Sequence, residues 1–232
     1  MYCKYYGLKE HPFNITSDPL FFFLNEAHKE AVSHLLYGIS QRKGILVITG
    51  EIGTGKTTLC RFLLNQLGEN VKTAFIMNPP PSENQLLQSI AKDFGIRFKF
   101  KSNLYILWEL NKFLLKESKK GNNVVLIIDE AQNLKPEVLE EIRLISNLET
   151  HKHKLIQIIL VGQPELKERL SLHSLRQLQQ RVIVRYDIKP LSKEEVKEYI
   201  RHRLEICGAD GKLQFELNSI EAIFEFSQGI PR

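Results

Sequence analysis

The sequence predicts an α/β fold in which a five-stranded parallel sheet is flanked by helices and followed by a small helical segment. Three observations lead to this prediction. Five short apolar runs alternate with stretches of helical spacing. One run leads into a glycine-rich turn, and another ends in two carboxylates. Beyond residue 188 the pattern is helical only, which indicates a partial all-α lid on a doubly wound domain.

The composition is that of an ordinary folded protein. The chain has 232 residues, of which 43% are hydrophobic and 25% charged, and this excludes a disordered chain. Its net charge of +5 is compatible with nucleic acid, anionic lipid or nucleotide as a partner and requires none of them. No apolar run approaches the roughly 20 residues of a membrane span, and the N-terminus lacks the apolar core of a signal peptide. Cys3, Cys60 and Cys207 lie far apart and indicate a reducing compartment, with neither a disulfide framework nor a metal site.

Residues 1–26 form an irregular aromatic segment, and residues 27–41 follow it with helical spacing. Because a free tail would be polar, we expect the aromatic segment to be an arm packed on a domain. The arm and the helix together either wall an adenine pocket or pack as plain core, and the sequence leaves both open.

A strand expected at 44–48 leads into the run Gly50-Glu51-Ile52-Gly53-Thr54-Gly55-Lys56-Thr57-Thr58, and a helix follows at 59–64. Strand, glycine-rich turn and helix are the context that the phosphate-binding GxxxxGK[ST] pattern requires. Glycines allow the backbone to turn its N–H groups toward a phosphate at a helix N-terminus. Lys56 would reach the β- and γ-phosphates, and the Thr57 hydroxyl would hold Mg²⁺. Residues 50–58 are therefore the predicted ATP-binding loop.

A second strand is expected at 73–77, where the prolines that follow prevent the chain from continuing as a helix. Ser82 is a good N-cap for a helix over 82–94, and a broad apolar face predicts another helix over 103–119. Between these helices, residues 97–101 alternate basic and aromatic side chains. That pattern suits single-stranded nucleic acid, but a solvated edge with its apolar residues turned inward is the simpler interpretation.

The apolar run 124–128 predicts a central parallel strand covered on both faces, and Asp129 and Glu130 follow it directly. Open α/β sheets bind ligands at the carboxyl ends of their strands. We therefore expect Asp129 to hold Mg²⁺ and Glu130 to polarise the water that attacks the γ-phosphate. The alternative is that both carboxylates cap a helix beginning at Ala131.

The rest of the sheet requires two further strands. We expect strands at 155–161 and 182–187, with helices at 136–148 and 165–180. Gln163 follows the fourth strand and lies at the same end of the sheet as Asp129. It either senses the γ-phosphate or caps the helix after Pro164. Arg181 precedes the fifth strand, where an isolated arginine is usually a surface charge.

The last part of the chain, residues 189–232, is interpreted as a helical lid on an α/β domain formed by residues 1–188. Helices are expected over 192–206, with a capping box that begins at Ser192, and over 218–227. These residues are too few to bury a core alone, so they should pack against the α/β part. The chain ends soon after a helix stop signal at Gly229, and we expect the lid to be truncated.

Several stretches together are similar to one family. They are the opening Tyr5-Tyr6-Gly7-Leu8, the loop and acidic pair described above, Val161-Gly162-Gln163-Pro164-Glu165-Leu166, and the closing Gly229-Ile230-Pro231-Arg232. With these motifs nearly the whole chain resembles an AAA+ ATPase, a P-loop NTPase class, and within it the ATPase domain of the ExeA/GspA (general secretion pathway protein A) family. The loop and acidic pair are common to many ATPases, whereas the last two stretches are much more specific.

The resemblance implies roles for residues whose own context is uninformative. Gln163 is similar to the sensor 1 residue, Arg181 to the arginine finger that AAA+ proteins offer to a neighbour's nucleotide, and Arg232 to the sensor 2 arginine of the lid. Arg176 and Arg185 are nearby rivals for the finger. Family members in secretion continue through the rest of the lid, a membrane span and a peptidoglycan-binding region. The sequence lacks these parts, so it does not support membrane attachment or wall binding by this chain.

The expected function is that of a Mg²⁺-dependent ATPase that binds ATP and ADP, oligomerises, and couples hydrolysis to assembly or transport. The system would be type II secretion or a related pilus or exopolysaccharide system, which supplies the partner protein. We expect a cytoplasmic location, with the full-length protein anchored at the inner membrane. The alternative is an ATP-dependent DNA-binding regulator of the transposition type, favoured by the net charge and by the basic runs 97–101 and 151–154. A small-molecule kinase is less favoured, because the acidic pair positions water that a kinase would exclude.

Overall fold

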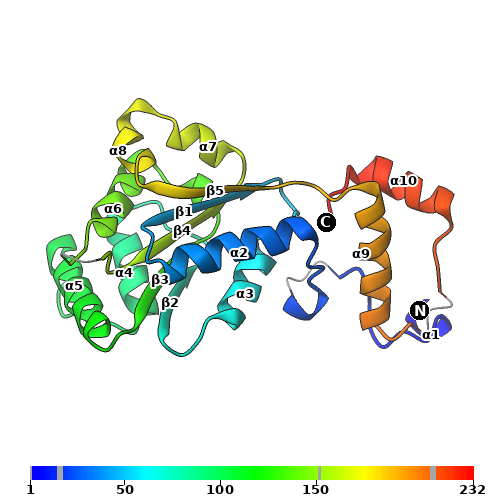
Figure 1. Ribbon diagram of the computed structural model, residues 1–232, viewed down its shortest axis with the longest axis horizontal. Helices are drawn as coiled ribbons and strands as arrows, with labels where there is room; N and C mark the ends of the chain where they lie inside the picture. Colours follow the sequence, from blue (N-terminus) through cyan, green and yellow to red (C-terminus); the bar gives the residue numbers. More distant parts are fainter. Residues whose placement is uncertain (1, 15–17, 151–152, 210–212) are drawn as a thin grey trace.

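A computed structural model describes residues 2–14, 18–150, 153–209 and 213–232 of the chain (Figure 1). Its centre is a parallel sheet in the order β2-β3-β4-β1-β5. The strands are β1 (Ile45–Gly50), β2 (Val71–Ile76), β3 (Asn123–Ile128), β4 (Gln157–Gly162) and β5 (Val182–Ile188). The predicted five-stranded parallel sheet is confirmed, and every strand ends at the same edge.

Helices cover both faces of the sheet, as the predicted fold class requires. One face is covered by α2 (Glu26–Ser40) and α3 (Lys56–Gln66). The other is covered by α4 (Glu83–Asp93), α5 (Asn103–Lys119), α6 (Pro136–Ser146), α7 (Glu165–Leu170) and α8 (Arg176–Gln179). In β3 the even-numbered residues face the second layer and the odd-numbered residues face the first. Because both faces are apolar, the run 124–128 is continuous rather than alternating.

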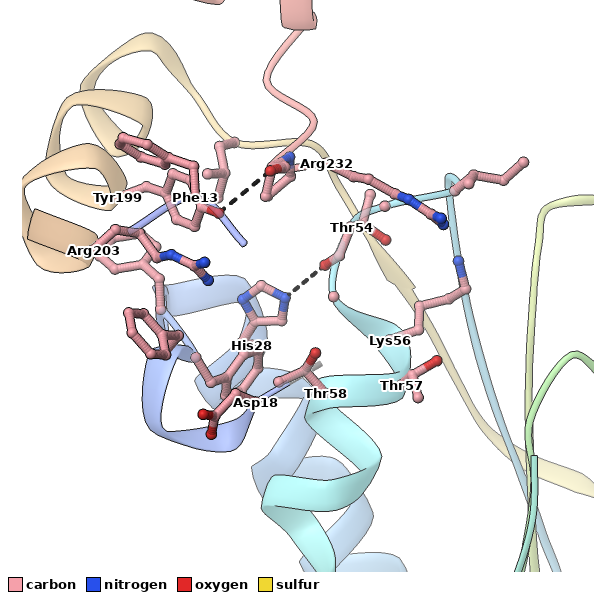
Figure 2. A pocket seen from close by; sticks show the side chains of 18 of the residues that line it. Phe13, Asp18, His28, Thr54, Lys56, Thr57, Thr58, Tyr199, Arg203 and Arg232 are labelled. Carbon is pink, nitrogen blue, oxygen red and sulfur yellow. Dashed lines mark hydrogen bonds between the residues drawn. The ribbon is translucent and has the colours of Figure 1, made fainter. Parts of the chain in front are cut away.

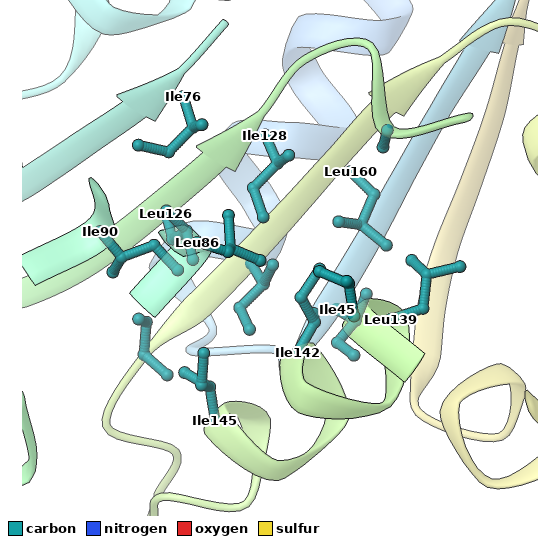
Figure 3. Packing of buried hydrophobic residues seen from close by; sticks show 14 of the residues in the cluster. Ile45, Ile76, Leu86, Ile90, Leu126, Ile128, Leu139, Ile142, Ile145 and Leu160 are labelled. Carbon is teal, nitrogen blue, oxygen red and sulfur yellow. The ribbon is translucent and has the colours of Figure 1, made fainter. Parts of the chain in front are cut away.

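The larger of the two cores lies under α4 and α6 (Figure 3). Leu86 and Ile90 of α4 and Ile142 and Ile145 of α6 are fully buried against the sheet. Burial of each such side chain contributes about 1.5–3 kcal/mol. This packing fixes the strand ends, and through them the residues that follow each strand.

Most helix boundaries agree with the sequence, because the capping residues do what their types predict. Ser82 accepts the backbone N–H of Gln85 and begins α4, and Ser192 forms a complete capping box with Glu195. The helix expected over 165–180 is wrong as a single element. It breaks after Leu170 into α7, the short turn η3 (His173–Leu175) and α8, and Ser171 turns its hydroxyl back onto the carbonyl of Lys167.

The N-terminal arm packs on the C-terminal helices and forms a third cluster away from the sheet (Figure 1). This third cluster contains residues of the arm, which includes α1 (Tyr2–Tyr5) and η1 (Pro19–Phe21). Its other residues come from α9 (Lys193–Ile206), α10 (Leu217–Ser227) and the segments beside them. The buried Arg203 of α9 donates to the carbonyls of Pro12 and Asn14, and its guanidinium lies 4.5 Å from the Phe21 ring centre. The division of the chain at residue 188 stays a prediction.

Two further sequence expectations concern the basic runs 97–101 and 151–154 on the protein surface. Phe98 is half-buried against the larger core, as a solvated edge predicts, but Phe100 is exposed. In the basic run 151–154, His151 and Lys152 lie outside the described residues. Among the residues that the structure describes, no helix is both long enough and apolar enough to cross a membrane.

Candidate nucleotide-binding site

The glycine-rich loop connects β1 to α3 in a conformation that requires glycine. Gly53 and Gly55 have φ angles of 87° and 88°, a region that other residues rarely adopt. Gly55 is the residue before α3 and offers no side-chain cap. The N–H groups of the first turn of α3 have no partner within the helix, and they lie at the loop. The predicted strand, turn and helix are all present, and they form a ready anion site.

Lys56, the first residue of α3, folds back over the loop. Its Nζ donates to the carbonyls of Gly50 and Glu51, each at 2.8 Å. Burial lowers the pKa of this ammonium, and the neighbouring Glu130 and Asp129 oppose that effect. A buried cation whose hydrogen bonds, within the described part of the chain, go to neutral carbonyl oxygens is well placed to exchange them for anionic oxygens.

Asp129 brings the end of β3 into contact with α3. The Thr57 Oγ1 hydroxyl donates to Asp129 Oδ2 at 2.5 Å, and the backbone N–H of Glu130 donates to Oδ1 at 2.9 Å. Asp129 is fully buried, and burial raises the pKa of its carboxyl group although both hydrogen bonds lower it. The sequence separates these residues by more than seventy positions, and the sheet order brings them together.

Glu130 stands next to Asp129 in a left-handed backbone conformation, with a φ angle of 52°. Its Oε2 accepts Gln132 Nε2 at 2.5 Å and Gln163 Nε2 at 3.3 Å. Gln132 Oε1 in turn accepts the backbone N–H of Gln163 at 3.1 Å. Glu130 makes no side-chain cap to the short helix that follows it, and the side-chain amide of Gln163 donates to Glu130 rather than to the start of α7. The capping alternatives are therefore wrong for these two side chains, and both lie in the site.

Gln132 is a site residue that the sequence analysis missed. It bridges Glu130 and the end of β4, and a Cβ at Gly162 would lie 2.7 Å from its Oε1. The available signal was its position, two residues after an acidic side chain at the carboxyl end of a buried strand. We call Lys56, Thr57, Asp129, Glu130 and Gln163 the loop side of the site.

A pocket of about 300 Å³ opens beside the loop (Figure 2). It is lined by the loop side apart from Asp129, by residues of the arm and α2, and by α9. We call its arm, α2 and α9 residues Phe13, Phe22, Phe23, His28 and Tyr199 the aromatic side. Its lining combines these aromatic side chains with charged and hydroxyl side chains that converge on the loop, and a concave site with convergent polar groups is the usual form of a ligand site. The arm and α2 therefore line the pocket beside the loop, and the adenine wall stays a prediction.

His28 joins the aromatic side to the loop. Its ring is 3% exposed and packs edge-on against Phe22, with ring centres 4.9 Å apart. Nε2 lies 3.0 Å from the carbonyl oxygen of Thr54, so Nε2 carries the proton in this contact (Figure 2). Burial lowers the pKa of His28, which favours the neutral ring. Asn25 caps α2 by accepting the N–H of His28, and it also donates to Glu195 of α9 at 2.8 Å.

The last residues of the chain return to the loop. The N–H of Leu191 donates to the carbonyl of Gly229 at 2.8 Å, and the hydroxyl of Tyr199 donates to that of Pro231 at 3.3 Å. A Cβ at Gly53 would lie 2.6 Å from the Cβ of Arg232. Arg232 therefore lines the same pocket as Lys56 (Figure 2).

The three arginines considered for the finger lie elsewhere. Arg181 precedes β5 and so sits at the amino edge of the sheet, opposite the loop; there it lines a separate hollow with Arg42 and Lys154. Arg185 is exposed on β5, and Arg176 is exposed at the start of α8. None of the three lines the loop-side pocket of its own chain. Any contribution from them to a nucleotide site would have to be made to another copy.

Fold and site together define a P-loop nucleotide-binding domain of the AAA+ class. Residues 39–170 match the family model described as an AAA domain. The chain therefore belongs to the AAA domain family. Over 233 aligned residues the whole chain is 41% identical to general secretion pathway protein A of Aeromonas hydrophila, and it spans 42% of that protein's length. The resemblance to the ExeA/GspA family is thereby confirmed.

Solved structures support the fold. The Cdc6p protein of Pyrobaculum aerophilum has a TM-score of 0.70 at 19% identity, covering 89% of this chain and 57% of that one. The ORC2 protein of Aeropyrum pernix, solved in ADPNP–ADP complexes, has a TM-score of 0.66 at 17% identity, covering 88% of this chain and 59% of that one. At these identities the likeness concerns the arrangement of strands and helices.

Proposed function

We propose that this domain binds ATP with Mg²⁺, hydrolyses it, and releases ADP. The observation that carries the proposal is the 2.5 Å contact between Thr57 Oγ1 and Asp129 Oδ2. It joins the hydroxyl that ends the phosphate-loop pattern to the first carboxylate after β3, and these two groups must meet around a metal-bound triphosphate.

The residues present fit a magnesium ion. Mg²⁺ prefers hard oxygen ligands and takes only one or two of them from the protein. A threonine hydroxyl and a buried carboxylate supply that donor set, and Thr57 and Asp129 would hold the ion. When bound, it would neutralise charge on the phosphate oxygens. Lys56 and the N–H groups of residues 50–58 would bind the phosphates themselves, because they are the cationic and N–H donors at the helix start.

Glu130 is the proposed general base. Its carboxylate lines the pocket and is oriented by the amides of Gln132 and Gln163. A carboxylate within reach of water accepts a proton as that water attacks the γ-phosphate. Gln163, as sensor 1, would link the state of the γ-phosphate to Glu130 and to the end of β4. Arg232 would contact the nucleotide from the lid.

We further propose that the domain works as a homo-oligomer in which Arg181 of one copy serves the site of the next. The position of Arg181 at the far edge of the sheet supports a role in trans, because it excludes a role in its own site. Arg176 and Arg185 stay rivals for this role. A finger contributed by a neighbour typically supplies about 10³–10⁵-fold in rate.

The cellular role proposed is coupling of hydrolysis to assembly or transport in type II secretion or a related pilus or exopolysaccharide system. The full-chain similarity to general secretion pathway protein A supports it. The proposed location is cytoplasmic, with a longer protein anchored at the inner membrane and acting on a secretion or pilus partner. The comparisons do not favour the alternative of a transposition-type DNA-binding regulator.

Two measurements test the ATPase proposal. Glu130→Gln keeps the shape of the side chain and removes the base, so it should bind ATP normally and lose about 10²–10⁴-fold in phosphate release. Full activity in this variant would remove Glu130 from the role. The rate per subunit should also rise with protein concentration if an arginine acts in trans; a rate that stays flat while the protein associates would exclude the finger.

A further inference from the structure

The outward side of α5 carries a line of exposed apolar and basic side chains. Leu104, Trp108, Lys112, Leu115 and Lys119 follow one another at steps of three or four residues, so they share one helix face, and all five are exposed. We call them the α5 stripe. Leu104 is 83% exposed and Trp108 54% exposed. Large apolar side chains aligned on a surface in this way mark an interaction site.

The core of the protein holds this stripe in place. Ile106, Leu110 and Leu114, on the opposite side of α5, are buried in the larger core. Ser102 caps the helix by accepting the backbone N–H of Tyr105. A fixed helix therefore presents the stripe outward, at the end of the molecule away from α9 and α10 (Figure 1). None of these described stripe residues lines the nucleotide pocket.

The excess positive charge of the chain is concentrated around the stripe. Residues 92–120 contain eight lysines and arginines against three carboxylates, which gives a net charge of +5, equal to that of the whole chain. Two of the three carboxylates are engaged within the fold. Glu117 is buried and paired with Lys120, and Asp93 accepts the backbone N–H of Phe75. A partner that complements this surface must therefore be anionic as well as apolar.

The lysines of the stripe lie beside its apolar side chains. The ammonium of Lys112 is 4.2 Å from the centre of the Trp108 ring and 3.5 Å from the third carboxylate, Glu109. Lys119 is exposed and forms no ion pair within the described part of the chain. In a helix that lies on a membrane, leucine and tryptophan enter the interface, and lysine stems extend so that their ammonium groups reach the headgroups. The stripe has this composition.

The same side chains suit a nucleic acid less well. Stacking of bases requires open aromatic faces, and Lys112 lies over the ring of Trp108. Leu104 and Leu115 have no ring for a base to stack on. Aliphatic side chains gain free energy by leaving water, and the boundary between headgroups and acyl chains allows this while it keeps anionic groups within reach of the lysines.

We infer that the α5 stripe docks this domain on an anionic lipid surface. The headgroups supply the negative charge that Lys112 and Lys119 meet, and the boundary with the acyl chains takes Leu104 and Trp108. The docking goes beyond the proposed ATPase and requires no nucleotide. It agrees with the proposed location at the inner membrane, and it leaves the nucleotide pocket free because the stripe takes no part in that pocket.

Binding to vesicles tests the inference. Wild-type protein should sediment with vesicles made of equal parts of phosphatidylcholine and phosphatidylglycerol, and it should not sediment with vesicles of phosphatidylcholine alone. Trp108 is the only tryptophan of the chain. Its emission should shift to shorter wavelength on binding, because the ring moves from water into the membrane interface. Added salt should weaken the binding.

Two kinds of variant separate the charge from the apolar contact. Lys112→Gln with Lys119→Gln should weaken partition into the anionic vesicles about tenfold or more, since each lysine near an anionic surface contributes roughly fivefold. Leu104→Ser should weaken the partition about tenfold with no change of charge, because it removes one apolar side chain from the interface.

The matched controls lie on other elements. Lys29 of α2 has the same 54% side-chain exposure as Lys112 and the same i,i+3 glutamate pair, and Lys197 is exposed on α9. Lys29→Gln with Lys197→Gln makes the same change of net charge away from the stripe, and it should leave binding within about twofold of wild type. Leu20→Ser, at a side chain of the arm that is 78% exposed, is the control for Leu104→Ser and should have no effect. Circular dichroism of each variant checks its fold.

Three outcomes would overturn the docking: no binding to anionic vesicles at low salt, binding without a shift of the Trp108 emission, or equal binding by wild type and Leu104→Ser. Tighter binding of a single-stranded oligonucleotide than of the vesicles, lost with the two lysines and kept in Leu104→Ser, would assign the stripe to nucleic acid instead. Failure to bind vesicles together with loss of self-association in Leu104→Ser would assign it to a protein contact.

The docking and the proposed ATPase can fail separately. Lys56→Gln removes a proposed phosphate-binding group and should bind vesicles as wild type does, because Lys56 lies outside the stripe. Vesicle binding by a protein that does not hydrolyse ATP would refute only the proposed ATPase. Hydrolysis of ATP by a protein that does not bind vesicles would refute only the docking.

Discussion

The loop side and the aromatic side of the pocket are built from different parts of the chain and are held in different ways. On the loop side, Lys56, Asp129 and Gln163 each lie within a few residues of the carboxyl end of a buried strand. On the aromatic side, Phe23 and Tyr199 come from segments far apart in sequence that meet by packing in the third cluster. Charges that must act on phosphates need fixed positions, which a buried sheet edge supplies. A surface that binds a flat base needs only a complementary shape. Segments from separate parts of the chain supply such a shape, and they can move relative to one another.

The largest effect on the rate of ATP hydrolysis should follow from removing the charge of Lys56 on the loop side. Lys56→Gln removes the ammonium while keeping a donor, and phosphate release should fall about 10²–10³-fold, the usual cost of losing one group that stabilises developing charge. A phosphate-release assay measures it. Lys72→Gln, at an exposed lysine on β2, is the control and should be neutral. Equal rates in both variants would disprove the role of Lys56.

The next effect tests how closely the end of the chain packs on the loop that carries the loop side. Gly53→Ala forces alanine into a left-handed conformation and directs its methyl group at Arg232, 2.6 Å away, and at Ile230, 2.8 Å away. The conformational cost alone is about 1–2 kcal/mol. Gly95→Ala carries the same kind of strain, at a φ of 71°, with nothing within 4 Å. Urea unfolding should show a larger loss of stability for Gly53→Ala, and only that variant should lose ATP affinity; matching losses would mean that the chain end does not rest on the loop.

A smaller effect separates the two sides by ligand. Phe22→Ala removes one ring from the aromatic side, which should weaken ATP binding about tenfold or less, in line with the 0.5–1.5 kcal/mol of an aromatic contact. Binding of inorganic tripolyphosphate should be unchanged, because it reaches only the loop side. Calorimetry with both ligands measures the difference. Phe100→Ala, at an exposed ring beside Tyr105 on the far side of the sheet, is the control. Equal weakening of both ligands would show that the aromatic side does not bind the base.

The smallest effect is a pH dependence of stability from His28 of the aromatic side and from His202 of α9, whose ring centre lies 5.6 Å from that of Phe23. Burial lowers the pKa of both His28 and His202 below the ordinary 6.5. In the window between the folded pKa and 6.5 the unfolded chain binds more protons, so stability rises with pH there and is lost as pH falls below 6.5. The loss is at most about 1.4 kcal/mol per pH unit for one histidine.

Urea unfolding between pH 8 and pH 5.5 measures this slope. His28→Asn should flatten it, because the substitution removes one of the two titrating rings. Ser33→Asn, at an exposed position of α2, removes no titrating ring and should leave the slope in place. A slope that is the same in both variants would mean that His28 does not contribute to it.

The same comparison explains what the sequence could predict. The sheet and the loop side were predictable, because Gly50 to Thr58 and the run ending in Asp129 are local patterns whose chemistry follows from their spacing. The aromatic side was predictable only in part: the sequence left open that the arm and α2 wall a pocket, but the contact of Arg203 with Pro12 spans 191 positions and no periodicity encodes it. The arm was expected to pack on a domain, but its neighbour, α9, became known only from the structure.

Two wrong predictions beside the sheet, the missed Gln132 and the single helix over 165–180, have a different cause. Gln132 was missed because glutamine in a short turn after a strand is unremarkable until Gly162 leaves room for its amide. The helix predicted over 165–180 failed because composition over sixteen residues outweighed the local effect of Ser171 and the residues after it. Both errors concern the hydrogen bonds of individual side chains, and a pattern averaged over a window does not detect them.

Asn25 connects the position of α9 to the phosphate loop. Its two hydrogen bonds tie the first turn of α2 to Glu195 in the capping box of α9, and His28 on that same turn grips the carbonyl of Thr54. If α9 tilts, these four residues would transmit the movement to the phosphate loop. A partner that binds α9 and a ligand that binds the phosphate loop would therefore act on the two ends of the same chain of hydrogen bonds.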